Sequence, residues 1–307
     1  MAGSAFLVGG LRVAGPFWRE PAPATSILAP IPDPERNATA RLLRLLDDPG
    51  GDGRLLAPVV ARLGSKGGVL LVPALLGGLG ARIGLGALAD EARLLARHGI
   101  RAHPARLSSS APVAANAERL LQEIAAAPGP LLLVAFSKGG LDSLEALRRA
   151  PSALREKVLG LATVQSPVHG SPLADALLAH PAAPLARAAL ALLAGSGEAL
   201  VDCATATRAA YFAAHGHGVT AILERMAAFS VASTVAAGDA SAFARLPSRA
   251  WIAEDAGAND GLVAVRSAIL PGAPYAVLPG LGHSETRLAG RSLVPALLRL
   301  LIEGAAS

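Results

Sequence analysis

Short, wholly apolar runs alternate with longer amphipathic segments from residue 68 to the end of the chain. A short apolar run is typical of a strand buried on both faces, and an amphipathic segment is typical of a helix covering the sheet. The alternation therefore predicts an α/β fold with a mostly parallel central sheet flanked by helices. The predicted strands are 69–72, 102–106, 131–136, 158–164, 228–235, 249–253 and 274–278.

The amphipathic segments carry apolar residues at helical spacing. In the segment 37–47, for example, Leu42, Leu43, Leu45 and Leu46 supply an apolar face. The predicted helices are 37–47, 85–97, 113–126, 140–149 and a closing helix at 291–302.

Two regions depart from the alternation. Residues 1–35 carry six prolines between Pro16 and Pro34, which predicts an extended N-terminal coil ahead of a domain at 36–307. In 171–219 the alternation is replaced by Ala- and Leu-rich helical sequence. We expect this segment to be a helical cap inserted in the domain; an ordinary pair of packed helices is the alternative.

The composition fits a globular protein built mainly on Ala, Leu and Val. Apolar residues make up 52% of the 307 residues and charged residues 17%. The formal net charge is +5, but the basic residues are scattered along the chain, so the sequence does not indicate a nucleic-acid partner. The single Cys203 excludes an intramolecular disulfide, and we expect a buried, inert thiol.

Targeting signals are not evident in the sequence. The first ten residues are apolar but lack a preceding basic residue, and the most apolar longer stretch, 184–194, is too short to span a bilayer. We therefore expect a cytoplasmic protein without a transmembrane segment.

The strongest local motif is LLLVAFSKGGL at 131–141, where an apolar strand runs directly into Ser137 and two glycines that open a helix. This arrangement is typical of a nucleophile elbow. The sharp turn requires small residues two positions before and two positions after the serine, and Ala135 and Gly139 meet that requirement. The motif predicts Ser137 as a nucleophile.

An oxyanion formed at Ser137 would lie over the amino end of the following helix. Backbone N–H groups and the helix dipole favour negative charge there, so the N–H of Lys138 is one expected oxyanion donor. The second donor is expected in the loop after the strand 69–72. We place this donor at Leu75; because Pro73 has no N–H, a residue next to Leu75 is the alternative.

A serine hydroxyl needs a base and an orienting carboxylate to act as a nucleophile. Asp260, in NDGLV, and His283, in GLGHSE, follow Ser137 in that order, and each comes after a predicted strand. Loops at the carboxyl ends of parallel strands meet at one edge of the sheet. The sequence therefore predicts a triad in which His283 is the base and Asp260 its orienting acid.

Each member of this triad has a plainer interpretation. Asp260 before Gly261 is also a common turn pair, and His283 could be a surface histidine in a glycine-rich loop. Asp255 is the main rival acid. The rival histidines, which lie in helices or before the last strands, are His98, His103, His180, His215 and His217.

With these motifs the region 68–303 resembles the bacterial lipase and esterase branch of the α/β-hydrolases. A further segment, VQSPVHGS at 164–171, is similar to the Thr-Pro-His-x-Gly-Ser segment of those lipases, with an extra Val168 before His169. We expect His169 to be structural or pocket-lining. The resemblance implies the α/β-hydrolase fold and cleavage of carboxylic esters. It also implies a calcium site, with Glu285 and Asp239 as acidic ligands, as an alternative to no cofactor.

The expected substrate is a small-molecule or lipid ester with an apolar acyl group, because the predicted cap and the loop 75–79 are rich in Leu and Ala. A polyester depolymerase, a thioesterase or an acyltransferase would use the same machinery. A non-catalytic ligand-binding protein is the alternative from another class, because fold alone does not determine function. Ser, Asp and His in this order argue for an enzyme.

Overall fold

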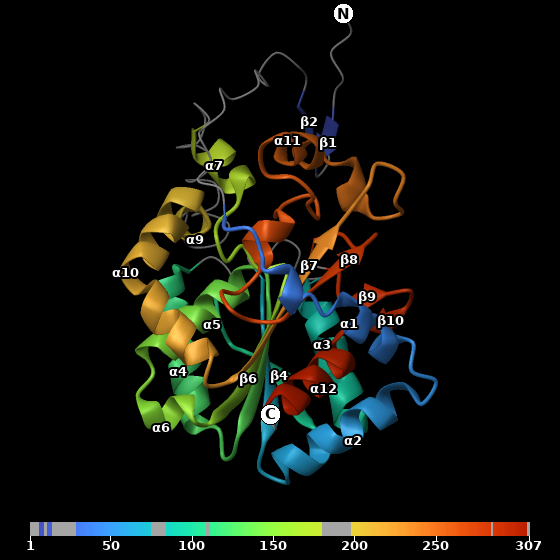
Figure 1. Cartoon of the computed structure of the whole chain (residues 1–307), viewed down its shortest axis with the longest axis vertical. Helices are drawn as coiled ribbons and strands as arrows, with labels where there is room; N and C mark the ends of the chain where they lie inside the picture. Colours follow the sequence, from blue (N-terminus) through green and yellow to red (C-terminus); the bar gives the residue numbers. More distant parts are fainter. Residues whose placement is uncertain are drawn as a thin grey trace, which may run out of the picture.

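A parallel six-stranded sheet, in the order β4-β3-β5-β6-β7-β8, forms the centre of the molecule (Figure 1). The structure, a computed structural model, describes residues 6–8, 11–13, 29–74, 84–108, 111–179, 198–283 and 285–305. The strands are β3 (Gly68–Val72), β4 (Arg101–Pro104), β5 (Leu131–Phe136), β6 (Val158–Val164), β7 (Ala227–Thr234) and β8 (Tyr275–Pro279). The predicted α/β fold with a mostly parallel sheet is confirmed.

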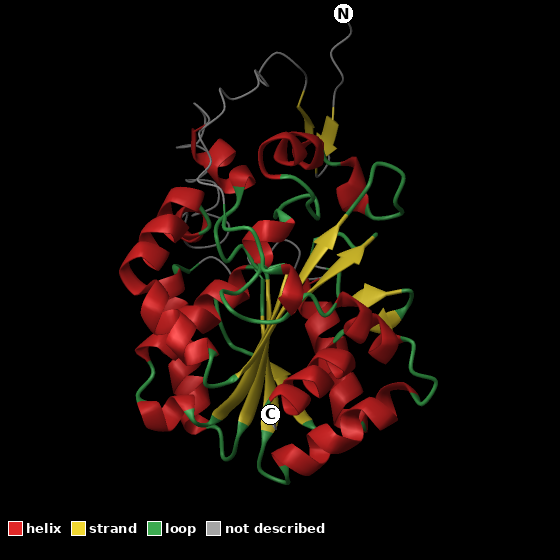
Figure 2. Ribbon diagram, in the orientation of Figure 1, coloured by secondary structure: helices red, strands yellow, loops and turns green. Residues whose placement is uncertain are grey.

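Helices cover both faces of this sheet (Figure 2). On one face lie α1 (Thr39–Leu46), α2 (Gly51–Leu63), α3 (Gly84–Arg97) and α12 (Val294–Gly304); on the other lie α4 (Val113–Ala126), α5 (Lys138–Arg149) and α10 (Thr205–Leu223). Side chains alternate across the strands. One core lies between the sheet and α12 (the first core) and another between the sheet and α4 (the second core). In β5, Leu132 and Val134 pack into the first core, while Leu131 and Leu133 pack into the second. This burial on both faces explains the uninterrupted apolar runs.

Shorter elements connect the main ones. They are η1 (Pro34–Arg36), α6 (Ser152–Arg155), α7 (Pro172–Ala179), α9 (Glu198–Asp202), η2 (Ala242–Arg245), α11 (Pro247–Ala256), η3 (Val265–Ala268), β9 (Arg287–Leu288) and β10 (Arg291–Ser292). The strands β9 and β10 form a separate antiparallel pair.

The predicted strand 249–253 is wrong, because these residues lie in the helix α11. A short apolar run cannot distinguish a buried strand from a buried turn of helix. The flanking residues carried the missing signal: Pro247 stands at the start of the helix and Gly257, with a φ of 84°, ends it. The sheet therefore has one strand fewer than the sequence predicted.

The helix α2 was not predicted. Its sequence, GDGRLLAPVVARL, begins with two glycines and contains Pro58, residues that normally argue against a helix. Its buried side chains Leu55, Leu56, Val59 and Leu63 pack into the first core with α12. Tertiary packing thus outweighs poor local propensity.

The two regions outside the alternation are described in part. In the predicted N-terminal coil, β1 (Phe6–Val8) and β2 (Leu11–Val13) form an antiparallel pair, which corrects the prediction for those residues. In the predicted cap, α7, α9 and the first part of α10 are helical as expected. Within the described residues no helix has both the length and the apolar character needed to cross a membrane.

Candidate active site

Ser137 occupies the turn between β5 and α5. Its backbone has a φ of 49° and a ψ of −126°, an unusual conformation for a residue with a side chain. Such a conformation costs about 1–3 kcal/mol and persists only where the surroundings enforce it. Here the N–H of Ser137 donates to the carbonyl of Val164 at the end of β6, at 2.9 Å. The neighbouring strand therefore helps to hold the elbow.

The glycines after Ser137 are required by close packing. A Cβ on Gly139 would lie 2.6 Å from the carbonyl oxygen of Pro73, and one on Gly140 would lie 2.2 Å from Oγ of Ser166. The elbow is therefore wedged between the loop after β3 and the loop after β6. Leu75, the predicted second oxyanion donor, is outside the described residues.

Lys138 is the first residue of α5. The first N–H groups of a helix have no partner within the helix, so the N–H of Lys138 is free of the intrahelical ladder. It comes directly after the serine, as an oxyanion donor must in an elbow of this form.

A chain of hydrogen bonds joins Ser137, His283 and Asp260. Oγ of Ser137 lies 2.9 Å from Nε2 of His283, and Nδ1 of His283 lies 2.9 Å from Oδ2 of Asp260. All three residues are buried. An ionised Asp260 accepts the proton of Nδ1, which leaves Nε2 to accept from the serine hydroxyl. The structure thus brings the three predicted residues together in the geometry of a nucleophile, a base and an orienting acid.

The two carboxylate oxygens of Asp260 have different partners. Oδ2 faces His283, while Oδ1 accepts hydrogen bonds from the N–H groups of Leu262 and Val263, at 2.9 and 2.8 Å. The preceding Asn259 accepts from the N–H of Val235, the residue that follows β7. Asp260 is therefore a turn residue, as its plainer interpretation held, and its second oxygen still reaches the histidine at the edge of the sheet.

Gln165 lies in the VQSPVHGS segment, where the sequence analysis gave it no role, and it supports the histidine loop. Its side-chain Nε2 donates to the carbonyl of Gly282, at 2.8 Å, and to Oγ of Ser233, at 2.6 Å. Gln165 is buried and has a φ of 54°. It follows β6 and so links the carboxyl ends of β6 and β7 to the residue before His283. No sequence signal marks this contact, because it joins residues 117 positions apart.

Glu285 also holds the histidine loop, through the N–H of Gly282. Its Oε2 accepts from the N–H of Gly282, at 2.9 Å, and its Oε1 accepts from Oγ of Ser241, at 2.8 Å. Both oxygens are thus occupied by protein donors, and Oδ2 of Asp239 accepts from the N–H of Ala236. No cluster of three or more acidic, His or Cys side chains able to hold a metal occurs among the described residues. The implied calcium site would need six to eight oxygen ligands, and in this structure these two carboxylates accept hydrogen bonds from the chain itself.

His169 lies apart from the hydrogen-bond chain. Its ring stacks on Phe212, with centroids 4.6 Å apart, and its backbone N–H donates to the carbonyl of Ser267. Burial, assisted by the nearby Arg208, lowers the pKa of His169 to about 4. The side chain is therefore neutral near pH 7 and packs as a structural residue.

The rival acid, two of the rival histidines and the cysteine belong to other elements of the fold. Asp255 is exposed on α11, and His215 and His217 lie on α10. Cys203 is buried, and burial raises its pKa to about 12, so the thiol is inert. His180 is outside the described residues.

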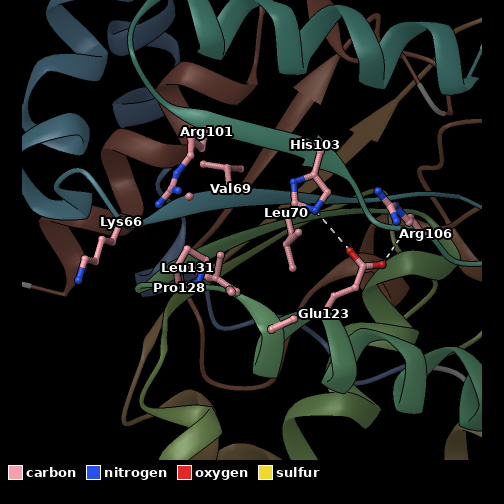
Figure 3. A pocket seen from close by; sticks show the side chains of 13 residues that line it. Lys66, Val69, Leu70, Arg101, His103, Arg106, Glu123, Pro128 and Leu131 are labelled. Atoms are coloured by element: carbon pink, nitrogen blue, oxygen red, sulfur yellow. Dashed lines mark hydrogen bonds and ion pairs between the residues drawn. The ribbon is translucent and has the colours of Figure 1, made fainter.

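A groove of about 340 Å³ lies elsewhere on the molecule, between the first halves of β3 and β4 and the end of α4 (Figure 3). In it, Nε2 of His103 lies 3.4 Å from Glu123, which also accepts from the N–H of Arg106. His103 is aligned with Leu133, through Leu70, and Leu133 is four residues before Ser137. At 3.3 Å per strand residue, His103 is about 13 Å or more from the elbow.

Comparisons with solved structures identify the fold. The metagenomic carboxyl esterase MGS0156 is 26% identical, with a TM-score of 0.63 over 80% of this chain and 77% of that one. The mature lipase BlEst2 of Bacillus licheniformis is 23% identical, with a TM-score of 0.57 over 72% of this chain and 86% of that one. No protein-family model and no curated protein sequence matches the chain. By its sheet, its helical layers and these likenesses, the chain has the α/β-hydrolase fold and belongs to that superfamily.

Proposed function

We propose that the protein hydrolyses carboxylic esters through Ser137, His283 and Asp260. The observation that carries the proposal is the continuous hydrogen-bond chain from the serine hydroxyl through the imidazole to the buried carboxylate. Ester hydrolysis also needs donors that stabilise the oxyanion. Because Ser137 stands at the start of α5, backbone N–H groups at this helix end are available for that role.

In the first half of the reaction His283 removes the proton from Oγ of Ser137 as the oxygen attacks the ester carbonyl. The negative charge that develops on the carbonyl oxygen is stabilised by the N–H of Lys138, and we assign the second donor to the N–H of Leu75. His283 then gives its proton to the leaving alcohol, and an acyl-enzyme remains on Ser137.

In the second half water takes the place of the alcohol. His283 removes a proton from the water as it attacks the acyl-enzyme, then returns the proton to Oγ of Ser137, and the carboxylic acid leaves. Asp260 keeps Nδ1 protonated throughout and stabilises the imidazolium that forms in each half. Every proton transfer is carried out by residues of the chain itself.

The comparisons support an ester as the substrate. The two solved structures reported above are named a carboxyl esterase and a lipase. The esterase is 26% identical in sequence, over 80% of this chain and 77% of its own. We further propose an apolar acyl group and a covering role for 171–219, on the Leu- and Ala-rich sequence of that segment. The cytoplasmic location stays a prediction.

Hydrolysis of a p-nitrophenyl ester series from acetate to palmitate tests this function. We expect turnover by the wild type and loss of turnover in Ser137→Ala. Ser152→Ala, which removes an exposed serine at the start of α6, is the control and should retain full activity. Absence of wild-type turnover on every ester would instead favour a specialised acyltransferase or a binding protein.

A further inference from the structure

Lys138 follows the proposed nucleophile in the chain, and its side chain is buried. Its Nζ lies 2.7 Å from Oδ1 of Asp142, one helical turn further along α5, and the two side chains are 1% and 2% exposed. A buried ion pair contributes little net stability, because desolvation of both charges offsets their attraction. Stability alone therefore does not explain a fully buried lysine at this position.

The pair belongs to a larger network. Oδ2 of Asp142 accepts from Nδ2 of Asn116 on α4, at 2.9 Å, and the same Nδ2 donates to the carbonyl of Ser108, at 2.8 Å. Burial raises the pKa of Asp142 to about 6, although Lys138 and Asn116 favour its ionised form. The network connects the first turn of α5 to α4 and to the loop after β4.

This connection bears on the backbone of the elbow. Lys138 supplies the proposed oxyanion N–H, and the strained Ser137 immediately precedes it. An oxyanion donor acts only within a few tenths of an ångström of its proper position, and a strained turn relaxes unless its neighbours are held. The side chain of Lys138 is bonded to Asp142, and Asp142 is bonded to Asn116 on α4, so the pair restrains the peptide that carries the donor.

We propose that Lys138, Asp142 and Asn116 form a positioning network that holds the strained elbow and the N–H of Lys138 in place for catalysis. The proposal rests on the proposed ester hydrolysis. The ammonium group itself is paired with Asp142 and acts through the backbone rather than on the substrate.

Lys157 provides a matched control. Its Nζ donates to the carbonyls of Ile124, Ala125 and Ala127 at the end of α4. This is also a lysine that joins two elements, but it lies at the far end of α4 from the elbow. Lys157→Met should lower the melting temperature and leave kcat within about twofold of the wild type.

The decisive variant replaces the ion pair by apolar residues of similar size, Lys138→Met with Asp142→Leu. Because no charge is left buried, we expect a folded protein with an unchanged or higher melting temperature. We expect kcat to fall about 10- to 100-fold with KM within about threefold, since a displaced oxyanion donor acts in the transition state. A purely structural pair would show no such separation.

Asn116→Leu keeps the approximate volume of the side chain, leaves the Lys138–Asp142 pair intact and serves as the second variant. It removes the amide that joins Asp142 to α4, so the link is broken, and we expect kcat to fall about tenfold at unchanged KM. A folded double variant or Asn116→Leu with wild-type kcat, or a loss confined to KM, would overturn the proposal. If the double variant does not fold, Asn116→Leu decides. Failure of the proposed function is distinct, because the wild type itself would then hydrolyse no ester.

Discussion

Two histidine–carboxylate pairs lie on different parts of the sheet and differ in distance, in exposure and in their further partners. His283 and Asp260 are 2.9 Å apart, with side chains 6% and 2% exposed, at the edge formed by the carboxyl ends of the strands. His103 and Glu123 are 3.4 Å apart in the groove, with side chains 60% and 19% exposed (Figure 3). A histidine and a carboxylate thus occur together in a buried pair and in an exposed one.

The difference shows what a histidine–carboxylate pair needs beyond proximity. Water competes for the exposed pair, which is worth at most about 1 kcal/mol, and Glu123 also accepts from a backbone N–H. The buried pair has a third partner, Ser137, held by a strained turn. His169 completes the comparison, because it is partly buried without a carboxylate partner and its pKa is lowered to about 4.

Among the variants that test this comparison, we expect Asp260→Asn to lower activity the most. The Asn carbonyl keeps the hydrogen bonds from Leu262 and Val263, but its amide would donate to Nδ1 of His283. Nε2 would then carry the proton and could not accept one from Ser137. We expect kcat for p-nitrophenyl esters to fall about 10⁴-fold with an unchanged fold by circular dichroism. A loss under tenfold would contradict the assigned role of Asp260.

Gln165→Leu should have the next largest effect, because it removes the donor that holds Gly282 and Ser233. We expect the free energy of unfolding to drop by about 1–3 kcal/mol, since buried acceptors lose their partner. We also expect kcat to fall about 10- to 100-fold as His283 shifts. The exposed Gln122→Leu on α4 is the control. Loss of stability with wild-type kcat would show that the loop keeps its position without Gln165.

The dependence of stability on pH tests the effect of burying a histidine, His169, without a carboxylate partner. Its pKa is about 4 in the folded protein and about 6.5 in an unfolded chain. The unfolded state therefore binds the proton first, so stability present above pH 6.5 is lost as the pH falls toward 4. In His169→Phe we expect this loss, between pH 7 and pH 4.5, to be smaller by about 2–3 kcal/mol. Urea unfolding measures it; parallel curves for both proteins would contradict the assignment.

The smallest effect is expected in the groove. His103→Ala removes the exposed member of the open pair. We expect kcat and KM to stay within about twofold of the wild type and the free energy of unfolding to change by less than about 0.5 kcal/mol. A large loss of activity in this variant would mean that the groove takes part in the reaction.

Much of the fold follows from the sequence because its strands are buried on both faces. Uninterrupted apolar runs such as 131–136 and 158–164 appear as strands with the predicted bounds. The prediction failed where a short apolar run was flanked by helix signals, in α11, and where glycine and proline concealed an amphipathic helix, in α2. In both cases tertiary packing decided what the local pattern left open.

The candidate site was predictable as far as its chemistry imposes residue types in a fixed order. Ser137, Asp260 and His283 each stand in a short motif at an edge of the sheet, and the structure brings them within hydrogen-bond distance. The supports were not predictable, because Gln165 and Asn116 act through contacts between distant segments. A buried Lys138 paired with Asp142 is equally invisible in the sequence, where lysine normally indicates an exposed position.

The most direct test of the central claim is to locate the covalent adduct of a fluorophosphonate by peptide mass spectrometry. Only a serine activated by a base reacts with such a probe. We expect one adduct, on Ser137, and much slower labelling in Asp260→Asn and His283→Ala. An unlabelled wild-type protein, or an adduct on another serine, would contradict the assignment of Ser137, His283 and Asp260 as the catalytic residues.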